Sequence, residues 1–193
     1  NNFCMVAATY PKYRARSNRF ESIAYRVNEC MERSLNGRPL DSASREMKAF
    51  VAYLKWVGKD VHPREEVFGT GIEKVAFLDR AADTTGGRRV FITKCMTCHG
   101  EDGQGLLNAD SVEYVYPPLW GPHSYNVGAG LYRLSSFAGY VKNNMPFGTT
   151  YHAPQLSNEE AWDVAAYVNS KPHPSVDISK DWPSVSSKPF DAP

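Results

Sequence analysis

The most constraining feature of this sequence is a C-x-x-C-H motif, formed by Cys95, Cys98 and His99. Two thiols at this spacing can form thioether bonds to the two vinyl groups of one porphyrin, while the adjacent histidine reaches the iron from the same side. A disulfide or half of a zinc site would also use such a pair. However, the sequence has no second cysteine pair for zinc, and the histidine directly follows the second cysteine. The motif therefore predicts a covalently bound haem c with His99 as an iron ligand.

The length of the chain leaves room for two domains, and its charge gives no reason to expect a nucleic acid or membrane partner. The chain has 193 residues, whereas a c-type domain needs only about 100. Lysine and arginine total 22 against 21 aspartate and glutamate, so the net charge of +1 gives no reason to expect a nucleic acid or an anionic membrane as partner. No apolar run approaches the roughly 18 residues that cross a bilayer. Because haem is attached covalently outside the cytoplasm, we expect an exported, periplasmic protein without a membrane span.

Apolar residues recur at helical spacing in several segments, which predicts a helical fold. The first predicted helix covers residues 22–35, and Asp41 or Ser42 is expected to cap a second one that ends near Gly58. The later predicted helices run from about residue 86 into the haem motif, over 137–144, and onward from a capping box at 156–160. Residues 1–21 show no such pattern and are expected to be irregular, and the prolines of segment 117–122 predict a fixed loop.

Two segments of the chain match two later segments at one constant spacing. Residues 46–54 match 160–168, including a shared Ala-Tyr-aliphatic triplet, and residues 27–31 match 141–145 in the same register. Such agreement predicts two copies of one domain. His99 projected back by this spacing falls before Asn1, so we expect the first domain to be incomplete as given, with its own C-x-x-C-H upstream.

Iron held by a histidine needs a sixth ligand or an open site. Met145, in the sequence Asn-Met-Pro-Phe-Gly between two predicted helices, is the best candidate for the haem of His99, although a core methionine is the alternative. The repeat places Cys30 or Met31 at the corresponding position of the first domain. A cysteine on an apolar helix face is more commonly a small core residue, so the residues alone leave this role open.

These inferences predict an all-α fold of two cytochrome c-like domains in tandem, the first N-terminally incomplete. The expected boundaries are 1–60 for the first domain, 61–80 for a linker, 81–170 for the second domain and 171–193 for an extended tail.

Five segments of the chain resemble the dihaem c-type thiosulfate dehydrogenases and, more distantly, the dihaem cytochrome subunit of the Sox sulfur-oxidising system. The haem and late-helix motifs are generic to cytochromes c, whereas the arginine-plus-cysteine segment is specific. The absent first C-x-x-C-H is a departure from the family. The resembling segments are 10–16, 26–40, 94–100, 117–122 and 161–170.

The resemblance implies a role for each candidate residue. In that family the active-site haem has a histidine on one side and a cysteine sulfur on the other, and this cysteine matches Cys30. Arg16, Arg26 and Ser34 match positions that line the thiosulfate pocket, although a solvated basic face is the ordinary role of such arginines. A second haem c is implied at His99, with Met145 as its distal ligand.

The resemblance also implies the chemistry, which is oxidation of thiosulfate to tetrathionate or the reverse. Guanidinium groups suit the two dianions that must meet. A thiolate ligand lowers a haem potential and a thioether raises it, so electrons should run from the Cys30 haem to the Met145 haem. Cys30 is also a candidate to carry a thiosulfate-derived sulfur covalently. The expected acceptor is a small cytochrome c or a high-potential iron–sulfur protein.

Two other functions compete with this one. A Sox-like cytochrome would conjugate thiosulfate to a carrier protein. A non-catalytic electron-transfer subunit would use its first domain as a scaffold without haem.

Overall fold

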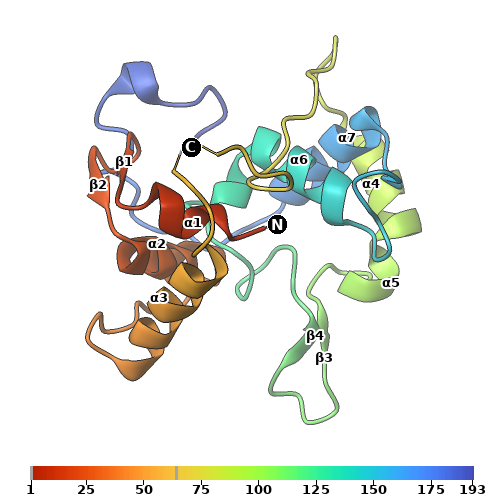
Figure 1. Ribbon diagram of the computed structural model, residues 1–193. Coiled ribbons are helices and arrows are strands. Elements are labelled where there is room, and N and C mark those ends of the chain that lie inside the picture. Colours follow the sequence, from red (N-terminus) through yellow and green to blue (C-terminus); the bar gives the residue numbers. More distant parts are fainter. Residues whose placement is uncertain (1, 64) are drawn as a thin grey trace. The chain divides into compact units, whose positions relative to one another are not determined.

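The computed structural model describes residues 2–63 and 65–193, so that Asn1 and Arg64, within the predicted first domain and linker, lie outside the described residues (Figure 1). The chain divides into two compact units. The first unit comprises the residues up to Ile72 together with Asp177–Phe190, and the second unit comprises Glu73–Val176 with Asp191–Pro193. The last stretch of the chain therefore contributes to both units, and residues 73–80 belong to the second.

The first unit contains helices, one hairpin and a π-helical segment. In chain order these elements are α1 (Met5–Thr9), β1 (Lys12–Arg14), β2 (Arg19–Glu21), α2 (Ile23–Glu29), the π-helix η1 (Cys30–Ser34), α3 (Arg45–Val57) and the short 3-10 helix η3 (Val185–Ser187).

The hairpin β1–β2 contradicts the prediction that residues 1–21 are irregular. The two strands are antiparallel, and the rings of Tyr13 and Phe20 meet edge to face with centroids 5.8 Å apart. Asn18 adopts a left-handed conformation with φ of 52°, which asparagine tolerates in turns. Its side-chain oxygen accepts a hydrogen bond of 2.7 Å from the Tyr13 hydroxyl. The hairpin is closed by a turn residue and cross-strand contacts, which apolar periodicity does not reveal.

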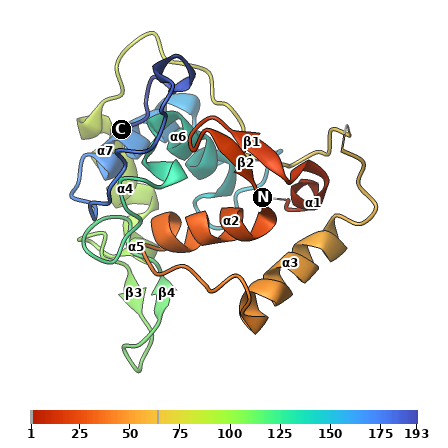
Figure 2. The ribbon, with the colours of Figure 1, turned by 90° about the vertical axis from the view of Figure 1, so that its left-hand side faces the viewer.

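The helix predicted over residues 22–35 changes its geometry midway. Ser22 caps α2, as its hydroxyl accepts the Tyr25 N–H. From Cys30 onward the segment is a π-helix, in which the Leu35 N–H donates to the Cys30 carbonyl at 3.0 Å, five residues back. The predicted helix exists, as the coiled ribbon at α2 in Figure 2 shows, but its second half has the hydrogen bonds of a π-helix.

Helix α3 begins later than predicted. Ser44, rather than Asp41 or Ser42, is the N-cap, because its hydroxyl accepts the Met47 N–H at 3.1 Å. The Asp41 carboxylate instead accepts the Ala43 N–H and forms a turn ahead of the helix.

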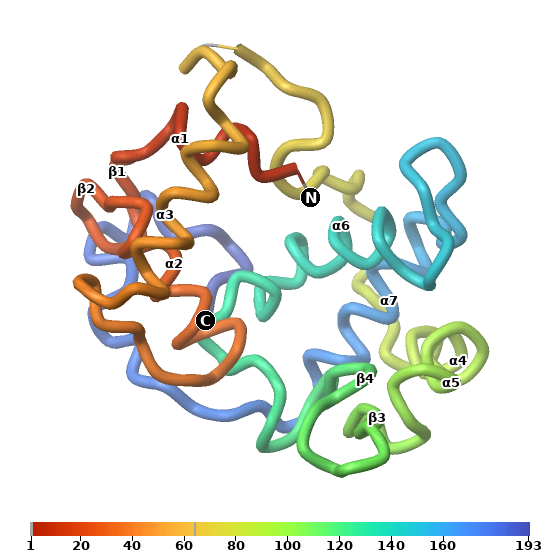
Figure 3. Tube along the Cα trace, turned by 60° about the horizontal axis from the view of Figure 1, so that its bottom comes forward, coloured from red at the N-terminus to blue at the C-terminus, as the bar shows by residue number. Residues whose placement is uncertain are grey.

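The three longest helices of the second unit, α4, α6 and α7, form its framework. Its elements are α4 (Thr84–Lys94), α5 (Met96–His99), β3 (Leu106–Leu107), β4 (Tyr114–Tyr116), the 3-10 helix η2 (Gly130–Tyr132), α6 (Leu134–Asn144) and α7 (Asn158–Asn169). Helix α7 packs against both α4 and α6 (Figure 3).

A close approach of backbones fixes the crossing of α4 and α7. A Cβ atom at Gly87 would lie 1.9 Å from the carbonyl oxygen of Asp163, so only glycine fits there. Beside the crossing, the Phe91 ring contacts the rings of Trp120 and Tyr167, with centroids 5.0 and 5.6 Å away. This aromatic cluster belongs to the apolar core of the second unit.

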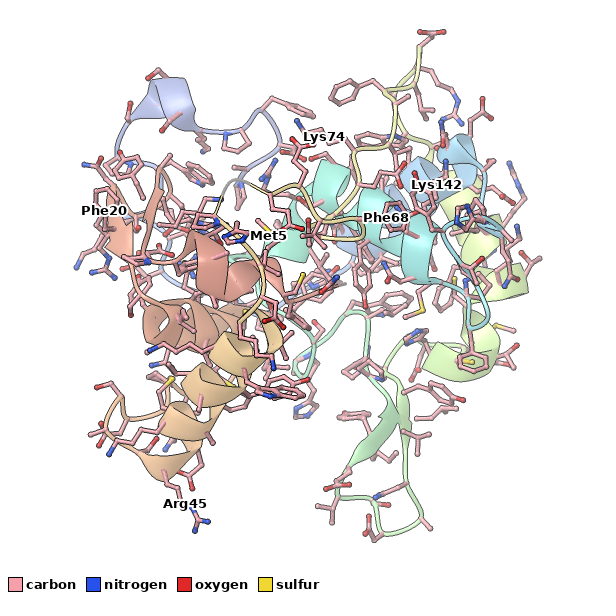
Figure 4. The ribbon with its side chains drawn as sticks, in the orientation of Figure 1. Met5, Phe20, Arg45, Phe68, Lys74 and Lys142 are labelled. Carbon is pink, nitrogen blue, oxygen red and sulfur yellow. The ribbon has the colours of Figure 1, made fainter. Side chains whose placement is uncertain are left out.

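The start of α7 agrees with the sequence. Ser157 and Glu160 form the predicted capping box, with side chain to backbone bonds in both directions. Lys142 of α6 donates to the Asn158 side chain at the first turn of α7, which ties these two helices together (Figure 4).

The prediction of an all-α fold holds only in its coarser form. The structure is mostly helical, but two short antiparallel hairpins, β1–β2 and β3–β4, accompany the helices. Among the described residues, none of the helices has the length and apolar character needed to cross a membrane.

Candidate functional site

The haem motif lies where α4 passes into α5. Cys95 ends α4, with its N–H bonded to the Phe91 carbonyl at 2.9 Å, while Cys98 and His99 lie in the short helix α5. The His99 N–H donates to the Cys95 carbonyl at 3.0 Å, so that one helical turn holds the three residues together. Both cysteines are half-buried free thiols in the part of the chain that the structure describes.

His99 is oriented by a backbone carbonyl. Its Nδ1 lies 2.8 Å from the carbonyl oxygen of Pro117, and a carbonyl can only accept a hydrogen bond. The proton of the neutral ring is therefore on Nδ1, and Nε2 carries the lone pair that binds a metal. The side chain is buried at 9% exposure. The carbonyl of Pro117 was not predicted as part of the site.

Two glycines bring the proline segment up to His99. Gly103 and Gly105 have φ of +66° and +77°, and a Cβ at Gly103 would lie 2.2 Å from the Trp120 ring. The Leu119 N–H donates to the Gly103 carbonyl at 2.8 Å. The glycine-rich turn after the motif thus lets segment 117–120 pack under the histidine.

Met145 directly follows α6, and its N–H still bonds to the Val141 carbonyl at 2.9 Å. It is half-buried against the same apolar cluster that Cys95 and Leu119 contact. Burial raises the pKa of the Cys95 thiol to about 11, which indicates apolar surroundings rather than a reactive thiolate. The two thiols, the Nε2 lone pair and the thioether fit a covalently bound haem c. No three His, Cys, Asp or Glu side chains of the described residues group into another metal site.

In the first unit Cys30 lies beside Arg26. Cys30 is half-buried, it opens the π-helix, and its N–H donates to the Arg26 carbonyl one turn earlier. Burial works against the charge of the Arg26 guanidinium, yet the adjacent Cys30 and Glu29 hold its pKa above the ordinary value. The Arg26 Nη1 lies 3.2 Å from the Glu29 carboxylate.

Arg16 and Arg33 meet at a single carboxylate from the far end of the chain. Arg33 binds both oxygens of Asp181, at 2.6 and 2.8 Å, and the Arg16 Nε binds one of them at 2.9 Å. Burial and the neighbouring Arg33 lower the pKa of Arg16. Burial alone would raise the pKa of Asp181, but the hydrogen bonds from Arg33 and Arg16 keep it below its ordinary value.

Glu29 connects these two groups. Its side chain is buried at 4% exposure, and its charge favours the protonated forms of Arg16, Arg26 and Arg33 alike. Arg14 faces another buried carboxylate, that of Glu21, at 3.9 Å.

The predicted pocket residues are only partly brought together. Arg26 and Cys30 are one turn apart, and Arg16 joins them through the charge of Glu29. Ser34 is exposed at the last residue of the π-helix, four residues after Cys30.

Sequence reasoning missed the carboxylates of this group, among them Glu29 and Asp181. The first could have been expected, because it lies three residues after Arg26 on a helix. For the second, 165 residues away from Arg16, the sequence offers no local signal.

The two units contain corresponding parts. In each, a helix leads into a sulfur-bearing residue, Cys30 in the first unit and Met145 in the second. A serine-capped helix follows, α3 after Ser44 and α7 after Ser157. This order agrees with the internal match found in the sequence.

Comparison with known families gives two matches. Residues 85–171 match the model of cytochrome c. Residues 1–62 match the cytochrome c domain described as SoxA/TsdA.

Known relatives of the chain share one name. A thiosulfate dehydrogenase of Allochromatium vinosum is 41% identical over 89% of this chain and 62% of its own length. Another, of Psychrobacter arcticus, is 39% identical over 92% of this chain and 53% of its own. The chain thus spans only about half to three-fifths of these relatives.

A solved structure agrees with the fold. That of thiosulfate dehydrogenase (TsdBA) from Marichromatium purpuratum, in the "as isolated" form, matches with a TM-score of 0.82 and 30% identity. The match covers 98% of this chain and 42% of that one.

Proposed function

Because this chain belongs to the thiosulfate dehydrogenase family of c-type cytochromes, we propose that it oxidises thiosulfate to tetrathionate beside Cys30 in the first unit. The observation that supports this most is the cluster of arginines and carboxylates in the first unit, of which Arg26 lies beside that cysteine. Haem c is the cofactor that its cytochrome c domains indicate.

The net charge of the cluster favours the binding of an anion. Four arginines, at positions 14, 16, 26 and 33, stand against three carboxylates, at positions 21, 29 and 181, which leaves one positive charge. The carboxylates hold the guanidinium groups in place, so that a thiosulfate dianion meets donors that are already ordered. Hydrogen bonds to charged groups contribute about 1.5–3 kcal/mol each, and this is the class of interaction that would bind the substrate.

The reaction balances without protons. Two thiosulfates each lose one electron, and a bond forms between their outer sulfur atoms to give tetrathionate. Haem c, when bound, would accept these electrons one at a time. The arginines bring the two dianions together against their mutual repulsion, which is the main electrostatic obstacle to coupling.

The sulfur ligands set the direction of electron flow in this proposal. Cys30 is the proposed iron ligand of the first unit, and His99 with Met145 those of the second. A thiolate ligand from Cys30 would lower the potential of its iron and the thioether of Met145 would raise that of the other, which would favour electron flow toward the haem held by Met145. The chain contains one C-x-x-C-H, in the second unit.

The proposal also covers the cellular location of the protein and its electron acceptor. Covalent haem attachment takes place outside the cytoplasm, which supports a periplasmic location. A small cytochrome c or a high-potential iron–sulfur protein is the proposed electron acceptor.

The decisive experiment compares Arg26→Gln with the wild type. The haem-loaded protein is supplied with thiosulfate and ferricyanide, and tetrathionate is measured by cyanolysis. We expect Arg26→Gln to lower kcat/KM roughly 100-fold, as removal of a preorganised donor does. Arg45, exposed at the start of α3, gives the matched control (Figure 4). Its change to Gln should leave kcat/KM within about twofold.

Two results would overturn the proposal. One is a wild type that forms no tetrathionate from thiosulfate. The other is an Arg26→Gln variant that is as active as Arg45→Gln.

A separate variant tests Cys30. If Cys30 binds the iron or carries sulfur, Cys30→Ser should abolish tetrathionate formation, whereas Met31→Leu should retain it. The reverse pattern would identify Met31 as the ligand that the internal match left open.

A further inference from the structure

We propose that Asp181 is a positioning residue of the anion pocket, whose carboxylate holds Arg16 and Arg33 in the arrangement that binds thiosulfate. The inference rests on the proposed function. It adds to the proposed thiosulfate site a residue of the C-terminal stretch Asp177–Phe190, which belongs to the same unit as both arginines.

The geometry around Asp181 is that of a fixed clamp. Arg33 engages it with both terminal nitrogens, at 2.6 and 2.8 Å, which is the bidentate geometry that best orients a guanidinium. Arg16 reaches the same carboxylate through Nε at 2.9 Å. The three side chains are 12–18% exposed, so solvent screens this group little.

The backbone reinforces the clamp. The Trp182 N–H donates to the Arg16 carbonyl at 2.7 Å, and the Asp181 N–H donates to the Ile178 carbonyl at 2.9 Å. Residues 181 and 182 thus hold the side chain and the backbone of Arg16 respectively. In Figure 1 this stretch runs beside the β1–β2 hairpin, whose turn contains Arg16.

The half-buried arginines Arg16 and Arg33 need such a partner. Burial and the charge of Arg33 both oppose the charge of Arg16, and burial also opposes that of Arg33, while an arginine has many rotamers through which it can escape to solvent. A shared carboxylate offsets the repulsion and leaves one orientation for each. Without Asp181, Arg16 would lose the bond that aims its guanidinium.

A rival interpretation is that Asp181 occupies the anion site and competes with the substrate. The contacts favour positioning. Both terminal nitrogens of Arg33 and the Nε of Arg16 bind the Asp181 carboxylate, so it would have to break these three hydrogen bonds to leave the site. The backbone bond from Trp182 to Arg16 also holds the segment in place. The two interpretations predict opposite changes in KM when the carboxylate is removed.

The test uses Asp181→Asn in the haem-loaded protein, with Asp191→Asn as matched control. Asp191 belongs to the same end of the chain and accepts a 3.0 Å bond from Arg133, but it lies in the second unit. We expect Asp181→Asn to raise KM for thiosulfate at least about tenfold, with kcat within about twofold, because ordered ground-state binding is lost. Asp181→Glu, which keeps the charge, should recover part of the affinity.

Binding measured directly separates this role from general damage. Calorimetric titration with thiosulfate, without an electron acceptor, should show the same loss of affinity in Asp181→Asn and none in Asp191→Asn. If Asp181→Asn does not fold, Arg33→Lys replaces it, because a lysine cannot bind the carboxylate through two nitrogens. That variant should raise KM in the same direction.

The outcomes distinguish the inference from the function. An unchanged or lower KM in Asp181→Asn, with an active wild type, overturns the positioning role and leaves the function intact. An equal rise in KM in Asp191→Asn also overturns it. A wild type that neither binds nor oxidises thiosulfate overturns the function, and the inference falls with it.

Discussion

The change Gly87→Ala adds one methyl group where α4, the helix that leads into the haem motif, contacts α7, and it tests whether close packing at this contact stabilises the second unit. Gly87 lies in α4 where α7 crosses, and a Cβ there would be 1.9 Å from the Asp163 carbonyl oxygen and 2.7 Å from the Tyr167 Cβ. The first obstacle is backbone, which cannot rotate away as a side chain can. Gly87→Ala must therefore push α4 and α7 apart.

The size of the effect follows from two opposing terms. In an open helix interior, Gly→Ala stabilises by about 0.5–1 kcal/mol. A carbon to oxygen contact normally needs about 3.3 Å, so the helices must separate by more than an ångström. Overpacking of this kind costs about 1–3 kcal/mol, and separation also loosens the aromatic cluster of Phe91. We expect a net loss of about 2 kcal/mol, or a Tm lowered by roughly 8–15 °C for a domain of this size.

The assay is thermal unfolding followed by circular dichroism at 222 nm. Gly130→Ala is the control, because no heavy atom among the described residues lies within 4 Å of its Cβ position. This variant should stay within about 0.5 kcal/mol of the wild type. A Gly87→Ala protein as stable as the control would refute the account of the helix crossing.

Three further predictions concern charged or capping groups. Asp163→Asn replaces one of the two oxygens that accept from Arg80 with an amide NH2 and removes the negative charge, and it should cost about 1–3 kcal/mol at pH 7, measured by denaturant unfolding. Folding lowers the pKa of Asp181 from its ordinary value of 3.8. The ionised carboxylate therefore contributes its full stabilisation of the folded state above pH 3.8, and this contribution is lost as the pH falls through the lowered pKa of the folded state. The Tm advantage of wild type over Asp181→Asn should therefore shrink as the pH is lowered below 3.8; an advantage that stays constant in this acid range would contradict this. Ser157→Ala should cost about 1 kcal/mol, with Ser179→Ala as an exposed control.

Local sequence rules were sufficient where the determinants lie within a few residues. The capping box of Ser157 and Glu160 is such a case, because both partners are three residues apart. The helix before Cys95 is another, since the haem motif that directly follows it indicates it. These features also place His99, although its carbonyl partner 18 residues later was not expected.

Other features depend on contacts that spacing cannot show. The apolar row over residues 22–35 fits an α-helix, and the change to π geometry at Cys30 appears only in the hydrogen bonds. Asp181 meets Arg16 and Arg33 across 165 and 148 residues, so no local pattern connects them. The pairing depends on how the end of the chain folds back onto the first unit.

Low-spin electron paramagnetic resonance of the oxidised, haem-loaded protein tests the central claim most directly. A haem with thiolate and histidine ligands has a g-tensor distinct from that of a haem with histidine and methionine. We predict a thiolate-type signal that thiosulfate perturbs and that Cys30→Ser abolishes, while the signal of the haem at His99 and Met145 stays unchanged. A spectrum without the thiolate-type signal, or one that Cys30→Ser leaves intact, would contradict the claim that the substrate reacts beside Cys30.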